Sequence, residues 1–190
     1  MAEPLLLRND SNGVATLTLN SPANFNALSD AMLAALKSAL QQLSDDPSVR
    51  VVVLNGAGRA FCAGHDLKEM QAARAAPDKG AAYFADLFTR CGAMMQAIPA
   101  LPQPVIAEVH GIATAAGCQL AASCDMVVST DSARFGVNGV NIGLFCSTPM
   151  VALTRKVPPA VAFEMLVTGE FLSAERAHEV GLVNRVCAAG

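Results

Sequence analysis

The sequence contains few charged residues and no cluster of basic ones. Only 15% of its 190 residues are charged, and the formal net charge at pH 7 is −3. Proteins that bind nucleic acid normally carry a patch or stripe of Lys and Arg, and none occurs in this sequence. We therefore expect no nucleic-acid partner, and we expect an anionic ligand to be held by local hydrogen-bond donors.

Long apolar runs are missing as well. The stretch 145–157 is interrupted by Pro149, Arg155 and Lys156, so it falls short of the roughly 20 apolar residues that a transmembrane helix needs. The run Leu5–Leu7 is too short for the apolar part of a signal peptide. These absences predict a soluble protein of the cytoplasm with no membrane partner. A mitochondrial location would remain compatible with a longer precursor.

Familiar cofactor and nucleophile motifs are absent. The six cysteines form no C-x-x-C pair and have no histidine at zinc-binding spacing, so we expect free, mostly buried thiols and no metal site. The loop Gly56–Phe61 lacks the third glycine of a dinucleotide-binding fingerprint. The chain also contains neither a P-loop nor a G-x-S-x-G elbow. We expect no resident cofactor.

What the sequence does contain is enough apolar material for a packed core. Apolar residues make up 53% of the chain, which excludes disorder, and the length favours one domain over residues 1–190. Ser29 precedes a stripe of leucines at 33, 36, 40 and 43, which predicts a capped amphipathic helix. The turn-rich stretch 9–13 predicts a hairpin.

Strand-like and helix-like segments alternate along the chain. Strands are expected at 5–8, 14–19, 49–54, 105–109, 125–129 and 183–186, and helices after Ser29, from Asp66, at 81–98, 117–123, 148–156 and 160–167, and after Ser173. This alternation predicts an α/β fold.

Two loops rich in small residues follow expected strands. They cover residues 60–70 and 110–119, and their Gly and Ala residues would let a ligand approach the backbone closely. The second loop leads into a helix start, where unpaired N–H groups and the positive end of the helix dipole are available. These loops are the candidate ligand-binding segments.

Motifs in and around these loops resemble the crotonase (enoyl-CoA hydratase/isomerase) superfamily. The matching segments are Asn26–Leu28, Phe61–Met70, Gly111–Cys118, Cys124-Asp125, Ala133–Gly136 and Thr168–Val183. They occur in the family's order and cover nearly the whole chain. The segments Gly64–Asp66 and Gly143–Pro149 resemble the enoyl-CoA hydratase domain-containing branch, which lacks both catalytic glutamates.

The resemblance implies a ββα spiral fold and a CoA thioester as substrate or ligand, in fatty-acid metabolism. It implies an oxyanion hole formed by the backbone amides of His65 and Ala116. Two donors aimed at the thioester oxygen would stabilise the negative charge that develops there. Alanine at 116 replaces the family's usual glycine but keeps the backbone donor. The residues implied in ligand binding are Ala63, His65, Asp66, Leu67, Lys68 and Ala116.

Both glutamates that the family uses for hydration are replaced. The position after Gly117-Cys118 is Gln119, and the matching position in the loop 137–141 is Gly139. An amide can hydrogen-bond a water molecule but cannot accept its proton near neutral pH, and glycine has no side chain. An ordinary two-glutamate hydratase, or a one-glutamate isomerase that uses the later position, is therefore not expected.

Other side chains are candidates for the missing base. They are Glu108, Asp86, Glu69, Cys146 and the ring of His65. Structural interpretations compete with each of these roles. Asp66 and Glu69 are suited to the first turn of a helix, Glu108 to solvent, and His65 to a backbone role.

Three further polar side chains lie in or beside these loops. His110 is suited to bonding a loop carbonyl. Lys68 and Arg59 flank the first loop and are candidate partners for the phosphates of CoA.

Two functions remain open on the sequence. One is an acyl-CoA lyase or isomerase with a nonstandard base, and the other is a non-catalytic acyl-CoA-binding or regulatory protein. Family members usually continue past Gly181–Val183 into helices that cover the acyl pocket and pack in trimers, whereas this sequence ends at Gly190. The resemblance therefore implies either a truncated C-terminal helical region or a protein without those covering and trimer contacts, and the assembly that it implies is a homotrimer or hexamer.

Overall fold

A β-hairpin opens the fold, as the turn-rich stretch predicts. In the computed structural model, which describes residues 3–188, strands β1 (Leu6–Ser11) and β2 (Val14–Leu19) pair antiparallel. Asn12 and Gly13 join them with φ values of 52° and 80°. Two consecutive positive φ angles are typical of the tight turn whose twist matches the flanking strands. The turn is shorter than expected, so β1 reaches three residues further than the sequence indicated.

Successive strands along the chain then alternate between two sheets. The larger sheet has the order β1-β2-β3-β5-β7-β10, and the smaller has the order β4-β6-β8-β9. Within the larger sheet, β2, β3, β5, β7 and β10 pair parallel. The remaining strands are β3 (Val51–Gly56), β4 (Ala60–Cys62), β5 (Val105–Val109), β6 (Ile112–Thr114), β7 (Met126–Thr130), β8 (Arg134–Gly136), β9 (Leu172–Ser173) and β10 (Arg185–Cys187).

The α/β class is confirmed, and the strand order gives it the form of a ββα spiral. Each of β3, β5 and β7 is followed by a strand of the small sheet and then by helix. The small sheet is not predicted by the sequence: 60–62 and 112–114 fall in the two expected loops, and no strand is expected at 134–136 or 172–173. Segments of two or three residues are too short to show the alternation that identifies a strand, and their partners lie far away in sequence.

Capping side chains start three of the helices as the sequence predicts. Ser29 accepts a hydrogen bond from Met32 N, Asp66 from Lys68 N and Glu69 N, and Ser173 from Arg176 N. The helices are α1 (Asp30–Ser44), α2 (Leu67–Ala73), α3 (Ala81–Ala100), α4 (Ala116–Ser123), α5 (Ser147–Leu153), α6 (Pro159–Thr168) and α7 (Ala174–Glu179), with 3₁₀ turns η1 (Pro22–Asn24) and η2 (Asn138–Ile142). Within residues 3–188, no helix combines the length and apolarity needed to cross a bilayer.

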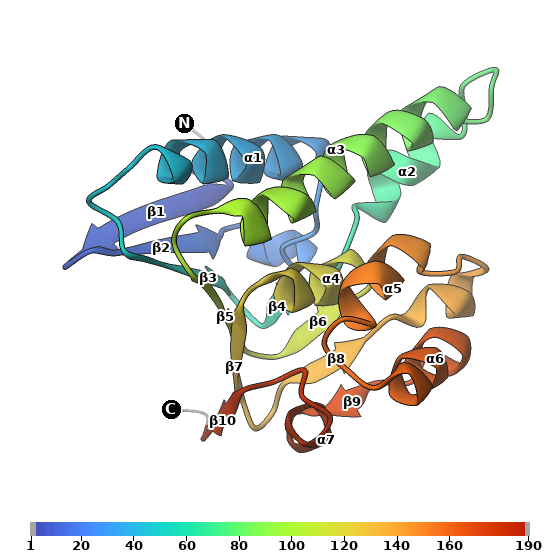
Figure 1. Ribbon diagram of the computed structural model, residues 1–190. Helices are drawn as coiled ribbons and strands as arrows, with labels where there is room; N and C mark the ends of the chain where they lie inside the picture. Colours follow the sequence, from blue (N-terminus) through green and yellow to red (C-terminus); the bar gives the residue numbers. More distant parts are fainter. Residues whose placement is uncertain (1–2, 189–190) are drawn as a thin grey trace.

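Helix α4 lies at the centre of the molecule. Figure 1 shows α1 and α3 side by side over the large sheet, with α4 below them and α5 beside it. Every residue of α4 except Ser123 is buried. The predicted free thiols are confirmed within the described residues, and all but the exposed Cys187 are buried.

Asn26 ties the segment before α1 to the turn between β3 and β4. Its side chain is fully buried, accepts a hydrogen bond from Ser21 N at 2.9 Å, and donates to the carbonyls of Ala57 at 2.9 Å and Ala60 at 2.8 Å. Its φ of 54° is one that asparagine tolerates better than most residues. Asn26 therefore fixes the path of the chain two residues before Leu28.

We expect Asn26→Ala to lower the free energy of unfolding by about 3 kcal/mol, because three backbone groups lose their partner and two of them are carbonyls inside the protein. Urea denaturation measures this change. Asn24→Ala is the matched control, since Asn24 is exposed and two residues away. Equal midpoints for the two variants would contradict the structural role of Asn26.

Candidate functional site

The first candidate loop leaves β4 and is held by a short bridge to Leu28. Leu28 N donates to Gly64 O at 2.7 Å, and Asp66 N donates to Leu28 O at 3.4 Å. In a parallel bridge of this kind, the residues on either side of His65 make the hydrogen bonds. The N–H of His65 itself points away from Leu28, and it has no backbone acceptor within residues 3–188.

The second candidate loop connects β6 to α4. Ala116 is the first residue of α4, so its N–H has no acceptor inside the helix and lies at the positive end of the helix dipole. The preceding residue, Ala115, has φ 50° and ψ −121°, a conformation that residues with a Cβ rarely adopt. Ala115 N donates to Gly136 O at 2.9 Å, which anchors this strained residue to β8.

The two loops meet at glycine positions. A Cβ added to Gly64 would lie 3.2 Å from Ala116 N, and a Cβ added to Gly117 would lie 2.1 Å from the carbonyl oxygen of Cys62. Only glycine permits so close an approach of α4 to β4. Two N–H groups without backbone acceptors, those of His65 and Ala116, thus lie on adjoining loops. A pair of this kind is suited to donating to one carbonyl or anionic oxygen.

The ring of His65 packs inside the protein. It meets the ring of Phe88 edge to face, with centroids 5.8 Å apart and an angle of 77°. Neither ring nitrogen has a hydrogen-bond partner within residues 3–188. Burial lowers the pKa of His65 below its usual value of 6.5, which outweighs the opposite effects of the Leu28 backbone and Asp30. The ring is therefore neutral at pH 7.

Two acidic side chains that follow His65 accept hydrogen bonds from N–H groups in the first turns of helices. The interpretation of Asp66 as a helix cap is confirmed, since its Oδ1 accepts from Lys68 N at 2.8 Å. Glu69 lies in the first turn of α2, as expected, and its Oε2 also accepts from Asp30 N, the first residue of α1, at 2.8 Å. Leu67 and Lys68 are exposed, and Ala63 is half-buried.

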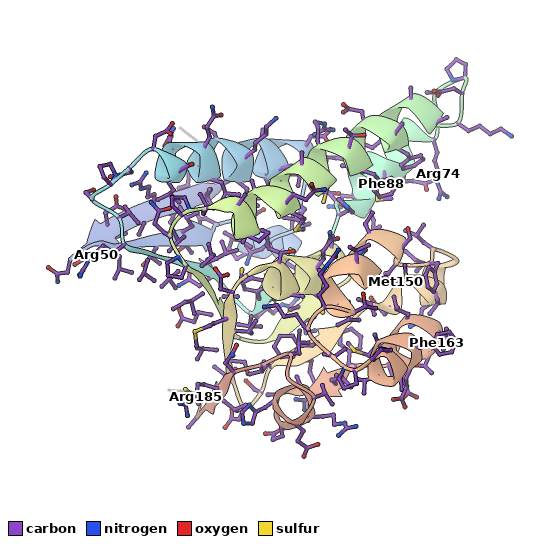
Figure 2. All side chains as sticks on the ribbon, in the orientation of Figure 1. Arg50, Arg74, Phe88, Met150, Phe163 and Arg185 are labelled. Carbon is purple, nitrogen blue, oxygen red and sulfur yellow. The ribbon has the colours of Figure 1, made fainter. Side chains whose placement is uncertain are left out.

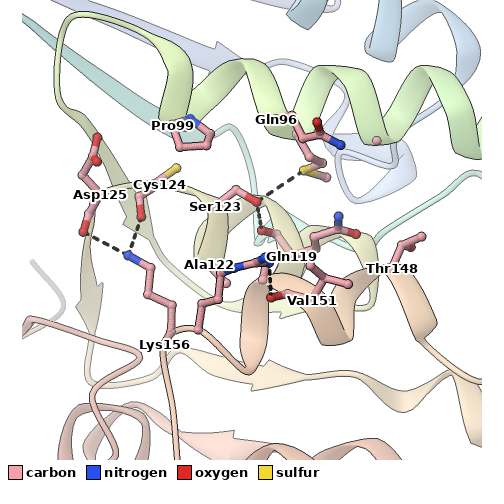
Figure 3. Close-up of a pocket in the computed structure, with 14 residues that line it drawn as sticks. Gln96, Pro99, Gln119, Ala122, Ser123, Cys124, Asp125, Thr148, Val151 and Lys156 are labelled. Carbon is pink, nitrogen blue, oxygen red and sulfur yellow. Dashed lines mark hydrogen bonds between the residues drawn. The ribbon is translucent and has the colours of Figure 1, made fainter.

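Gln119 lies one turn into α4 from Ala116. Its side chain is buried, with 7% of its surface exposed, and its Oε1 has no hydrogen-bond partner in the described part of the chain. Gln119 lines a cavity of about 700 Å³ between α3, α4 and α5 (Figure 3). Gln119 therefore lines this pocket on the same helix that carries the Ala116 N–H.

Gly139 is closely surrounded by the loop that follows it. Leu144 N donates to Gly139 O at 2.9 Å, and a Cβ added to Gly139 would lie 2.2 Å from Leu144 O and 2.8 Å from Cys146 Sγ. The position therefore has no room for a side chain in this loop conformation. Burial raises the pKa of the Cys146 thiol, which keeps it protonated at neutral pH.

The other polar candidates have structural partners. Glu108 is exposed on β5 and accepts from Asn55 Nδ2 at 3.1 Å, and Asp86 is exposed on α3 and paired with Arg90. His110 Nε2 lies 2.7 Å from Gly58 O, which confirms its expected bond to a loop carbonyl. The guanidinium of Arg59 stacks 4.5 Å above the ring of Phe25. Residues 3–188 contain no group of three His, Cys, Asp or Glu side chains placed to hold a metal ion.

Sequence reasoning missed two contributors to this arrangement. Leu28 was noted in a motif, but its role in orienting the His65 N–H depends on a bridge across 37 positions and leaves no local signal. The partners of Gln119 around the cavity were missed for the same reason. They come from α3 and α5, which are separated by about fifty residues in the chain.

Comparison with known proteins agrees with this architecture. The family model described as enoyl-CoA hydratase/isomerase matches residues 9–190. Enoyl-CoA hydratase domain-containing protein 3, mitochondrial, of Xenopus laevis is 47% identical over 96% of this chain. The chain spans 60% of the length of that relative.

Solved structures of similar sequence share the fold of this chain. The crystal structure titled enoyl-CoA hydratase of Mycobacterium smegmatis is 63% identical, with a TM-score of 0.93, and the match covers 98% of this chain and 71% of the other. The human enoyl-CoA hydratase domain-containing protein 3 is 43% identical, with a TM-score of 0.90 and the same coverage of both chains. The family match and the shared fold together show that this chain belongs to the enoyl-CoA hydratase/isomerase (crotonase) family.

Proposed function

We propose that this chain binds an acyl-CoA or enoyl-CoA thioester and holds its carbonyl oxygen between the N–H groups of His65 and Ala116. The observation that carries the proposal is the position, on adjoining loops, of two N–H groups that have no backbone acceptor among residues 3–188. In the proposed oxyanion hole, both donors strengthen their hydrogen bonds as negative charge develops on the oxygen. One such donor contributes about 2.7–4 kcal/mol to lowering a reaction barrier.

Polarisation of the thioester makes two reactions easier. It makes the Cα proton more acidic and the β-carbon more electrophilic. Hydration at the β-carbon also needs a group that removes a proton from water and one that delivers a proton to Cα. Gln119 and Gly139 offer neither, so we propose that ordinary hydratase turnover is weak.

Two functions are compatible with a bound thioester. Either the protein is an enzyme of the hydratase/isomerase type, a lyase or isomerase with a nonstandard base, or it is a non-catalytic acyl-CoA-binding or regulatory protein of fatty-acid metabolism. Gln119 favours the second function, because its buried Oε1, which has no hydrogen-bond partner within residues 3–188, can accept a hydrogen bond from a ligand but cannot take its proton near neutral pH.

We propose the cytoplasm as the location, with the mitochondrion as the alternative. The word mitochondrial stands in the name of the Xenopus laevis relative. The more identical Mycobacterium smegmatis structure comes from a bacterium, which has no mitochondrion. That greater identity supports the cytoplasm.

We also propose that the protein assembles as a homotrimer or hexamer. Large apolar side chains are exposed on and around α6, among them Phe163, of which 66% is exposed, and Ile142, of which 64% is exposed. Figure 2 shows Phe163 at the outer side of α6. Exposed apolar surface on this scale is typical of an association site.

We expect the purified protein to bind crotonyl-CoA while hydrating it slowly or not at all. Isothermal titration measures binding, and loss of the enoyl absorbance measures hydration. Turnover close to that of ordinary hydratases would contradict the assignment of Gln119 and Gly139, and failure to bind would contradict the proposed function.

Gly64→Ala tests the junction of the two loops. The added methyl would lie 3.2 Å from Ala116 N. We expect binding to weaken at least about 10-fold, because one donor is obstructed. Gly143→Ala is the matched control, since Gly143 also has a positive φ but its Cβ would meet nothing within 4 Å. Equal losses in both variants would mean that strain, and not obstruction, is responsible.

Gly139→Glu should fail to restore hydration even when it is combined with Gln119→Glu. The new Cβ would collide with the carbonyl of Leu144, so we expect Gly139→Ala alone to destabilise the protein by about 1–3 kcal/mol. Thermal unfolding of Gly139→Ala, beside Gly92→Ala with its open Cβ position, measures this cost. A double variant that folds well and hydrates crotonyl-CoA would show that the loop can move aside.

His65→Phe separates the backbone of His65 from its ring. We expect thioester binding to change less than about 2-fold, because the N–H remains. Because the folded state lowers the pKa of His65 below 6.5, the unfolded state binds a proton first as pH falls below 6.5, and the folded state loses stability until its own lower pKa is passed. Urea denaturation at pH 7.5 and pH 5.5 should therefore show a smaller loss for His65→Phe than for the original protein.

A further inference from the structure

The cavity that Gln119 lines has a charged end. Gln119 and Thr148 lie toward one side of this α3–α4–α5 pocket, and Lys156 lies at the other side beside Cys124 and Asp125 (Figure 3). Gln119 lies in α4, whereas Cys124 and Asp125 follow the last residue of this helix, Ser123. The pocket therefore extends from the turn next to the Ala116 N–H to the C-terminal end of α4.

Most of the pocket wall between these ends is apolar or small. Met95 and Pro99 contribute from α3, Ala122 from α4, and Val151 and Ala152 from α5. A wall of this composition suits the methylene groups of an acyl chain. The polar residues in this part of the wall are Gln96 of α3 and Ser123 of α4, whose hydroxyl already donates to Gln119 O at 2.8 Å.

Two cations at the pocket lack a carboxylate partner. Lys156 Nζ donates to the carbonyls of Cys124 at 2.8 Å and Asp125 at 3.2 Å, and Arg155 Nη1 donates to the carbonyl of Val151 at 2.9 Å. None of the ion pairs formed within residues 3–188 includes either cation. The neighbouring Asp125 carboxylate bonds Val105 N at 2.7 Å.

These contacts with backbone carbonyls hold the Lys156 and Arg155 side chains in place. They do not neutralise the positive charges, because a carbonyl carries no net charge. Both bond carbonyls at or beside the ends of α4 and α5, which is a common structural use of Lys and Arg. A guanidinium has five N–H groups, and one bond to Val151 leaves donors for a bidentate contact with an anion. Arg155 is also exposed enough to reorient toward a ligand.

The opposite end of the pocket carries a second sign of a ligand. Gln119 is 93% shielded from solvent, and its Oε1 has no hydrogen-bond partner in the described part of the chain. A buried acceptor without a partner is costly, and a bound ligand or its water would supply one.

We propose that the pocket receives the acyl group of the thioester and that this acyl group ends in a carboxylate, as in a short dicarboxylic acyl-CoA. The inference rests on the proposed function, because the thioester itself is placed at the His65 and Ala116 N–H groups. The methylene groups lie along the apolar wall, and the terminal carboxylate pairs with Arg155 and Lys156.

The test compares thioesters of equal carbon number. Binding of adipyl-CoA and hexanoyl-CoA is measured by isothermal titration at low salt, together with glutaryl-CoA and pentanoyl-CoA. We expect each dicarboxylic thioester to bind about 10-fold more tightly than its partner, as a charge-assisted hydrogen bond provides. In Arg155→Gln most of this preference should disappear while hexanoyl-CoA binding is retained, and Arg155→Lys should recover part of it.

Arg185→Gln is the control, because Arg185 is an exposed arginine on β10, away from the pocket (Figure 2). Thermal unfolding checks that each variant is folded. Equal binding of hexanoyl-CoA and adipyl-CoA overturns the carboxylate inference and leaves the proposed function standing. An equal loss of both thioesters in Arg155→Gln also overturns it. Absence of binding by all four thioesters overturns the proposed function and this inference together.

Discussion

The contact between Gly117 and the carbonyl of Cys62 is the constraint on which the rest of the site depends. Because Gly117 has no side chain, α4 begins directly against β4, and the strained Ala115 turns the chain into the helix. This approach brings Ala116 N next to Gly64. From the other side, Leu28 bonds Gly64 and Asp66 and leaves the His65 N–H directed away from it. The candidate site is thus made of backbone, held by close packing.

A site made of backbone separates ligand binding from chemistry. The N–H groups of His65 and Ala116 remain whatever side chains evolve around them, whereas proton transfer depends on individual carboxylates. At the two positions where we predict those carboxylates from the family resemblance, this chain has the buried Gln119 and a glycine, Gly139, with no room for a side chain. The proposed thioester-binding role is therefore compatible with turnover or with its absence, and in our proposal the pocket beyond Gln119 selects the acyl group.

Local sequence patterns predicted the large elements well. The leucine stripe of α1, the caps at Ser29, Asp66 and Ser173, and the strands of the large sheet each have a signal within a few residues. The small sheet had none, because its strands are two or three residues long and pair with distant segments. The family motifs also identified His65, Ala116, Gln119 and Gly139 as positions of interest, although the roles assigned to them stay predictions.

The sequence by itself determined the α/β class, the family, and the absence of carboxylates at positions 119 and 139. Each of these depends on residue identity or on short-range periodicity. Only the tertiary structure decided that the His65 ring faces Phe88, that Gly139 has no room for a side chain, and that Lys156 shares a pocket with Gln119. These properties arise where segments far apart in the chain pack together, and packing distances of a few ångströms leave no trace in local sequence.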